Sequence, residues 1–180
     1  MTPTPTTQAQ AAAPGSAAPL VSHRLAAFAL ALLLGLQPVT TDVYLPALPM
    51  LARDLAAPMS AAQLTMSALI LAFGVAQMFW GPVADRVGRR PVLITGLLLY
   101  TAASIGSMLA GGIGWLVLWR VLQGATMAAA VVCARAIVRD LYEPLEGARV
   151  MSLALSGLGV IAIAGPALGG VVAALGGWRA

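Results

Sequence analysis

Five long runs of apolar residues, separated by short polar segments, occupy the chain after about residue 24. An α-helix needs roughly 20 consecutive apolar residues to cross the hydrocarbon core of a bilayer. The runs are continuous and lack the alternation of barrel strands, and a helix pairs its own backbone groups in lipid. We therefore predict an all-α, polytopic membrane helix bundle with spans at about residues 25–48, 62–80, 92–110, 113–138 and 150–175.

Composition supports the membrane as the solvent. Of the 180 residues, 60% are hydrophobic and 9% are charged, whereas about a quarter of an average soluble domain is charged. Residues 1–23, rich in Thr, Pro, Ala and Gln, predict a disordered tail. No cationic segment precedes the first run, as a cleaved secretory signal would require, so the run should remain as the first span. The single cysteine, Cys133, has no disulfide partner and predicts core packing.

All ten Lys and Arg residues are arginines, and most flank the spans. Positive residues in short loops mark the cytoplasmic side. This rule predicts a cytoplasmic amino terminus, with His23, Arg24, Arg86, Arg89, Arg90, Arg139 and Arg149 inside and Arg53 and Arg179 outside. The net charge of +4 alone would suit a nucleic-acid partner. The arginines, however, are scattered among apolar runs and do not line one solvated face, which argues against such a partner.

Asp42 is the sharpest anomaly, because it lies in the first apolar run. An Asp at the centre of a membrane helix costs roughly 2.5–3.5 kcal/mol on insertion scales. Pro38 in the same span predicts a bend, which membrane helices tolerate beside protein or a water-filled cavity. Asp42 is thus a candidate functional acid; the alternative is a place at the outer interface. Polar residues around it could face a cavity: Gln37, Thr40, Thr41 and Tyr44.

Arg120 lies inside the fourth run and is the candidate partner of Asp42. Counting from the outer ends of their helices places both charges roughly 9–10 Å deep. We expect Arg120 to pair with Asp42 or to face a cavity, and the alternative is that it snorkels outward. Gln123 and Met127 on the same run are further cavity candidates, although core filling is the ordinary role of a methionine.

A charged segment at residues 81–91, GPVADRVGRRP, separates the second and third runs. Its glycines allow a sharp turn, and its charges could form a network that differs between conformations. The alternative is that its arginines only obey the positive-inside rule. The candidate gating residues are Gly81, Asp85, Arg86, Gly88, Arg89 and Arg90. In the fifth run, Gly165, Pro166, Gly169 and Gly170 predict close helix packing and a bend.

These segments resemble motifs of the major facilitator superfamily. Residues 81–91 look like its loop between helices two and three, and LVLWRVLQG at 116–124 resembles its helix-four motif. GPALGG at 165–170 is similar to the helix-five motif of drug/proton antiporters, although Ile161 stands where that motif usually has glycine. DVYLPALP at 42–49 and ARAIVRDL at 134–141 resemble the Bcr/CflA drug-resistance branch.

The resemblance implies a twelve-helix transporter, of which this chain would supply helices one to five of the amino-terminal half. It implies proton-coupled efflux of amphiphilic or cationic compounds across an inner membrane, with the proton gradient in place of a cofactor. Asp42 would carry the proton and Arg120 would modulate it. The chain without the carboxy-terminal half is expected not to transport.

Three other functions are alternatives to efflux. A proton-coupled symporter importing a small nutrient would share the fold. A membrane enzyme would need a cluster of catalytic or metal-binding residues, yet His23 is the only histidine. A helical scaffold would not need Asp42 or a bend at Pro38.

Overall fold

The computed structural model describes residues 23–179, in which all regular structure is helical. The elements are α1 (His23–Asp42), the 3-10 helix η1 (Leu45–Ala47), α2 (Leu48–Asp54), α3 (Met59–Val87), α4 (Arg89–Met108), α5 (Ile113–Leu141) and α6 (Pro144–Gly176). Residues 27–54 and each of α3 to α6 are long and apolar enough to span a membrane. The predicted all-α bundle with five spans is confirmed. The predicted tail lies outside the described residues, except for His23, which begins α1.

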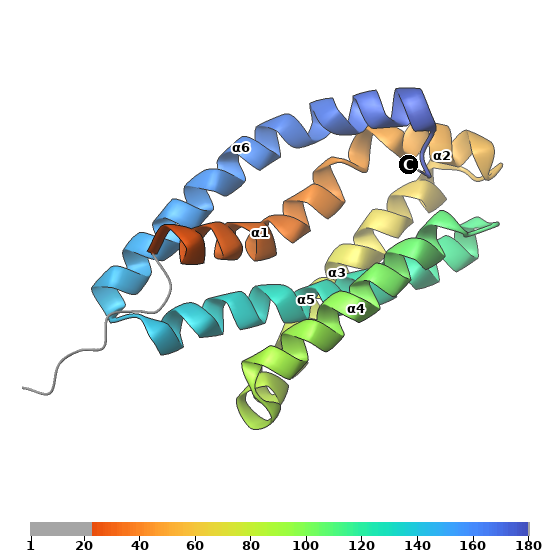
Figure 1. The fold of residues 1–180 in the computed structure, drawn as a ribbon. Coiled ribbons are helices and arrows are strands. Elements are labelled where there is room, and N and C mark those ends of the chain that lie inside the picture. Colours follow the sequence, from red (N-terminus) through yellow and green to blue (C-terminus); the bar gives the residue numbers. More distant parts are fainter. Residues whose placement is uncertain (1–22, 180) are drawn as a thin grey trace, which may run out of the picture.

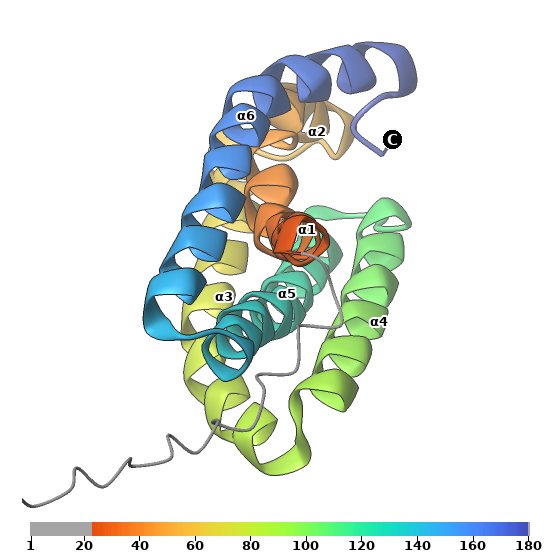
Figure 2. The ribbon, with the colours of Figure 1, turned by 60° about the vertical axis from the view of Figure 1, so that its left-hand side comes forward.

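The helices form two groups that meet at α1. α5 packs along both α3 and α4, and α1 packs along α6 (Figure 1). α1 also contacts α5 and so joins the groups (Figure 2). α5 is the most buried of the five spans. The outward surface of the other helices carries exposed apolar side chains such as Met78, Ile163 and Leu175, which suit contact with lipid.

The connections between helices are shorter than the charged segments predict. α3 continues to Val87 and α4 begins at Arg89, so the predicted loop between the second and third spans is reduced to Gly88. Gly88 has a φ of 99°, in the left-handed region that favours glycine. The polar stretch after α5 is similarly helical, except around residues 142–143. Charged residues are compatible with helices whose ends project beyond the hydrocarbon, so apolar runs delimit the membrane-crossing part of each helix.

The first span is broken after Asp42. Pro46 has no N–H for the carbonyl of Asp42, four residues earlier, and its ring would clash with that carbonyl in a continuous helix. The chain instead turns at residues 43–44, forms η1, and restarts as α2 with Pro49 in its first turn. The break places Tyr44 and Asp42 at the end of a helix inside the bundle.

Two contacts between helices depend on glycine. A Cβ on Gly124 of α5 would collide with the carbonyl oxygen of Leu69 on α3, so this position holds the two helices close together. Gly35 of α1 faces Ile161 of α6, and a Cβ there would lie 3.0 Å from the Ile161 Cδ1 atom. The bulk of Ile161, which replaces a glycine of the resembling helix-five motif, is thus accommodated by Gly35 opposite.

Candidate functional site

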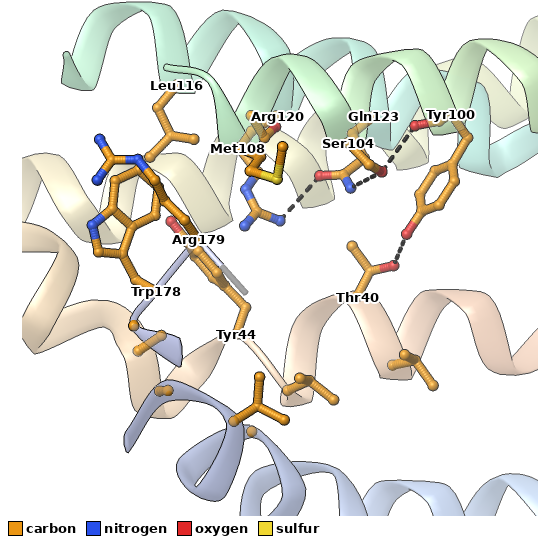
Figure 3. Close-up of a pocket in the computed structure, with 18 residues that line it drawn as sticks. Thr40, Tyr44, Tyr100, Ser104, Met108, Leu116, Arg120, Gln123, Trp178 and Arg179 are labelled. Atoms are coloured by element: carbon orange, nitrogen blue, oxygen red, sulfur yellow. Dashed lines mark hydrogen bonds between the residues drawn. The ribbon is translucent and has the colours of Figure 1, made fainter. Parts of the chain in front are cut away.

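A cavity of about 290 Å³ lies where the second halves of α1, α4 and α6 meet the first half of α5 (Figure 3). Apolar side chains form part of its wall, including Val39, Val43, Met108, Leu116 and Val172. Its polar lining comes from α1, the break that follows α1, α4, α5 and the segment after α6: Thr40, Tyr44, Tyr100, Ser104, Ser107, Arg120, Gln123, Trp178 and Arg179.

Arg120 is the charged group at the centre of this site. Its side chain is 8% exposed, and its guanidinium carbon lies 3.7 Å from the centroid of the Tyr44 ring. Nη1 donates a hydrogen bond to Gln123 Oε1 at 3.0 Å, while Nε is buried and has no hydrogen-bond partner among the described residues. The guanidinium is therefore held by a ring and an amide, with donor capacity left over.

Hydrogen bonds link the cavity walls to one another. Gln123 Nε2 donates to Ser104 Oγ at 2.8 Å, which connects α5 to α4. The hydroxyls of Thr40 and Tyr100 lie 2.6 Å apart and connect α1 to α4. Because the single hydroxyl proton of Thr40 is donated to the carbonyl of Leu36 at 2.6 Å, Tyr100 is the donor. These bonds orient the polar wall without using the free donors of Arg120.

The predicted pairing of Asp42 with Arg120 is absent: no ion pair joins them in the described part of the chain. Thr40 and Tyr44, four residues apart, both line the cavity, whereas Asp42 is two residues from each and points to the opposite side. There its Cβ faces Gly165 of α6, where a glycine Cβ would lie 3.1 Å from it. The sequence places the two residues at similar depth in the membrane but does not specify which way each side chain points around its helix axis. Because Asp42 and Arg120 point to different sides, the two charges do not meet.

Asp42 itself is half-buried beside the break in the first span. Thr41 Oγ1 lies 3.0 Å from Asp42 Oδ1 and 3.1 Å from the carbonyl oxygen of Gln37. The carboxylate thus has a hydroxyl neighbour and no cation within ion-pair distance among the residues that the structure describes.

The structure divides the remaining cavity candidates. Thr40, Tyr44 and Gln123 line the cavity, as does Arg120. Gln37 and Thr41 of α1 are not among the lining residues, and neither is Met127, which is fully buried in α5. Sequence reasoning missed the α4 wall, although Tyr100, Ser104 and Ser107 form a polar stripe at helical spacing within an apolar run. It also missed Trp178 and Arg179 at the end of the chain.

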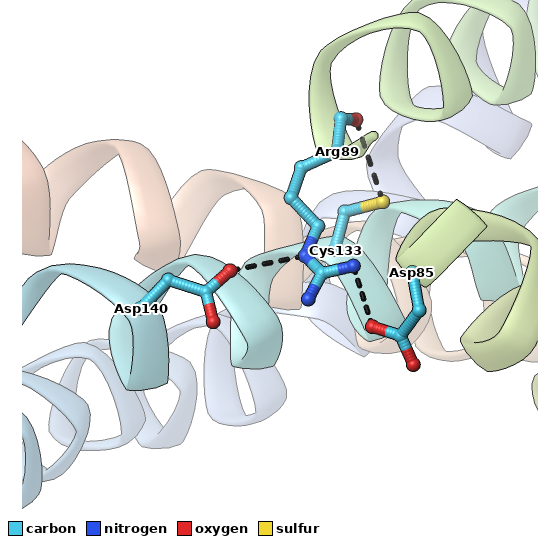
Figure 4. Close-up of polar contacts among 4 residues, drawn as sticks. All are labelled: Asp85, Arg89, Cys133 and Asp140. Carbon is cyan, nitrogen blue, oxygen red and sulfur yellow. Dashed lines mark hydrogen bonds and ion pairs between the residues drawn. The ribbon is translucent and has the colours of Figure 1, made fainter. Parts of the chain in front are cut away.

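The charged segment at the far end of the bundle forms a network around Arg89 (Figure 4). Arg89 Nη1 lies 2.6 Å from Asp85 Oδ1, and its Nε lies 3.1 Å from Asp140 Oδ2. One side chain thereby joins α3, α4 and α5, and Asp140 was not among the predicted gating residues. Arg86 and Arg90 are exposed and show no ion pair within the described residues, and Gly81 lies inside α3.

The helix-five motif packs α6 against the break in the first span, as its small residues predict. A Cβ on Gly169 would collide with the carbonyl oxygen of Val43. Gly170 is less constrained, since its Cβ would lie 4.0 Å from the Pro46 Cβ. Pro166, by contrast, is exposed inside α6.

Comparison with known proteins gives a consistent set of relatives. A family model described as "Major Facilitator Superfamily" matches residues 27–180. The chain is 34% identical over 151 residues to "Multidrug resistance protein D" of Escherichia coli (strain K12), covering 84% of this chain and 38% of that protein. It is 39% identical over 140 residues to "Chloramphenicol resistance protein" of Pseudomonas aeruginosa, covering 77% of this chain and 33% of that protein.

A third relative is "Uncharacterized MFS-type transporter YdgK" of Bacillus subtilis (strain 168), 37% identical over 155 residues. That match covers 86% of this chain and 39% of the relative. The chain thus spans between a third and two fifths of the length of these relatives. With five membrane-spanning helices and a family match that extends over nearly all of them, this chain belongs to the Major Facilitator Superfamily.

Proposed function

We propose that this chain forms helices one to five of a proton-coupled exporter of amphiphilic small molecules, in the Bcr/CflA branch, with its amino terminus on the cytoplasmic side of an inner membrane. The observation that carries the proposal is the buried Arg120 guanidinium, with an unpaired Nε, beside a cavity of mixed polar and apolar lining. The names of two relatives, a multidrug and a chloramphenicol resistance protein, support efflux as the activity.

The length of the relatives supports the architecture. Since this chain aligns with between a third and two fifths of each, the full-length protein is proposed to contain twelve helices in two halves. Substrate would bind between the halves near the membrane midplane. The present cavity would then be the part of that site contributed by α1, α4, α5 and α6.

Asp42 is proposed as the group that carries the proton. A half-buried carboxylate in a membrane span is costly when charged, and protonation relieves that cost. Asp42 is also linked to the cavity through the backbone, because Tyr44, two residues away, contacts Arg120. A change of charge at Asp42 would shift the end of α1 and with it the ring beneath the guanidinium.

The test is proton release on substrate addition, measured with a pH indicator on the full-length protein in detergent. Wild type should release protons, Asp42→Asn should not, and Asp42→Glu should retain part of the release because it keeps a titrating group. Membrane insertion of Asp42→Asn should be normal, which separates coupling from folding. If Asp42→Asn releases protons as wild type does, the coupling acid lies elsewhere and Asp42 is structural.

The direction of transport is tested separately. Inverted vesicles carrying the full-length protein should accumulate substrate when the lumen is made acidic, as an exporter that exchanges it for protons would. Substrate accumulation in right-side-out vesicles driven by an inward proton gradient would instead identify an importer.

A further inference from the structure

The charges that line the cavity are all of one sign. Arg120 lies at its centre and Arg179 at its edge, and no Asp or Glu belongs to its lining among the described residues. Asp42 faces α6 on the opposite side of its helix, and Asp85 and Asp140 belong to the network around Arg89. A ligand in the cavity therefore meets a positive field that this part of the chain does not neutralise.

Arg120 also has hydrogen-bonding capacity that the protein leaves unused. A guanidinium carries five N–H donors and no acceptor. In this site Nη1 is bound to Gln123, the flat face lies on Tyr44, and Nε has no partner. A buried donor without an acceptor is unfavourable, and a charged donor forms its strongest hydrogen bonds to anionic oxygens. An oxygen acceptor on a ligand would satisfy it.

The second arginine reinforces this preference. Arg179 stacks on Trp178, with its guanidinium carbon 4.1 Å from the ring, and its Nη2 donates to the carbonyl of Ala110 at 3.2 Å. Both arginines thus have their flat faces on rings, and neither forms an ion pair with a carboxylate of the described residues. An organic cation entering here would lose its hydration beside two positive charges, and no carboxylate of the described residues would replace that hydration.

We propose that the cavity selects amphiphiles whose polar end is an anionic or neutral oxygen acceptor bound to Arg120, and that it rejects organic cations. This inference rests on the proposed function in treating the cavity as the substrate site. The sequence alone leads us to expect amphiphilic or cationic substrates, and the inference restricts these substrates to uncharged and anionic amphiphiles. The volume of about 290 Å³ suits one small molecule, with its apolar part against the walls formed by Val39, Met108 and Leu116.

The test uses three probes of one shape: 4-phenylbutanoate, 4-phenylbutanamide and 4-phenylbutylammonium. Their equilibrium binding to the full-length protein in phosphatidylcholine nanodiscs is followed at pH 7.5 by calorimetry and by tryptophan fluorescence, since Trp178 lines the cavity. The butanoate should bind at least about 10-fold more tightly than the ammonium, a difference of about 1.4 kcal/mol. The neutral amide should lie between them.

Variants assign the preference to the cavity. Arg120→Gln should reduce the butanoate affinity about 10-fold and the amide affinity less, because it removes a charge-assisted hydrogen bond. Arg120→Lys should keep the order of the three probes. Arg53→Gln is the matched control, since Arg53 is an exposed arginine of α2 outside the cavity lining, and it should change none of the affinities.

The wild-type order alone can overturn the inference, without any variant. Ammonium binding as tight as butanoate binding, or no saturable binding of any probe, would do so. Because binding is measured without a proton gradient, the outcomes are separable. If the cation binds and substrate still induces proton release, the proposed export function stands and the proposed selectivity is overturned. If the probes bind in the predicted order but no proton is released, the selectivity stands and proton-coupled export is overturned.

Discussion

At the residue scale, the geometry of Arg120 makes a prediction about charge and shape. Arg120→Lys keeps the positive charge but loses the planar face over Tyr44 and the fixed hydrogen bond to Gln123. A desolvated cation–π contact is worth about 2 kcal/mol, and a lysine over the ring would keep part of it. In cells expressing the full-length protein, Arg120→Lys should retain part of the drug resistance and Arg120→Leu almost none.

Membrane abundance of both variants serves as the control for that measurement. If both reach wild-type membrane levels and both give wild-type resistance, Arg120 acts neither through its charge nor through its hydrogen bonds. The buried Arg120 guanidinium would then no longer support the proposed exporter.

The sequence predicts that charged residues inside the membrane form a site, but it does not predict which residues come together there. A costly charge inside an apolar run identifies Arg120 and Asp42 without any structure, and Arg120 does line a cavity. Their separation could not be predicted, because it depends on the rotation of α1 relative to α5. The same reason explains Met127, which a count along the helix places one turn from Gln123 but which is fully buried.

At the element scale, the number of spans follows from the apolar runs, while the helix ends do not. Hydropathy reports where lipid begins, and α3, α5 and α6 each continue past that point into charged sequence. The break after Asp42 is different, since Pro46 gives a local steric reason for it that the sequence contains. Packing partners lie beyond such local rules, because α1 pairs with α6 from the opposite end of the chain.

Gly169 makes a prediction about the contact between α6 and the break in the first span. Any Cβ at Gly169 meets the backbone carbonyl of Val43, which cannot move without displacing α1 or α6. Overpacking of this kind costs about 1–3 kcal/mol. Gly169→Ala should therefore lower the thermal unfolding midpoint in detergent and reduce resistance in cells.

Gly159→Ala is the matched control, because it makes the same substitution on the same helix. A Cβ at Gly159 would have no neighbour within 4 Å, and alanine favours helix over glycine. Its unfolding midpoint should equal or exceed that of wild type. A midpoint for Gly169→Ala that matches Gly159→Ala would show that the close approach of α6 to Val43 is not required for stability.

At the scale of the whole molecule, the arginines are distributed unequally between the two ends of the helix bundle. One end carries the start of α1, the α3–α4 turn and the α5–α6 turn, and the other carries α2, the α4–α5 connection and the last described residues (Figure 1). Most arginines outside the spans belong to the first end, including the network around Arg89. The positive-inside rule predicts that this end is cytoplasmic.

Thiol labelling tests that orientation with the chain's own cysteine as a control. Val87 at the end of α3 is 61% exposed, Leu109 at the end of α4 is 72% exposed, and Cys133 is 0% exposed. An impermeant maleimide should label Val87→Cys in inverted vesicles but not in spheroplasts, because the α3–α4 turn is predicted to be cytoplasmic. Leu109→Cys, at the opposite end, should show the reverse pattern.

The pair of variants makes the result independent of reagent leakage. A leaking membrane would label both positions in both preparations, whereas an inverted topology would exchange the two patterns and overturn the predicted orientation. The unmodified 180-residue chain should remain unlabelled in either preparation, since Cys133 lies in the core between Ala84, Val92 and Ala129. Labelling of Cys133 would mean that α5 separates from α3 and α4 at that end, so the chain would adopt a second packing arrangement.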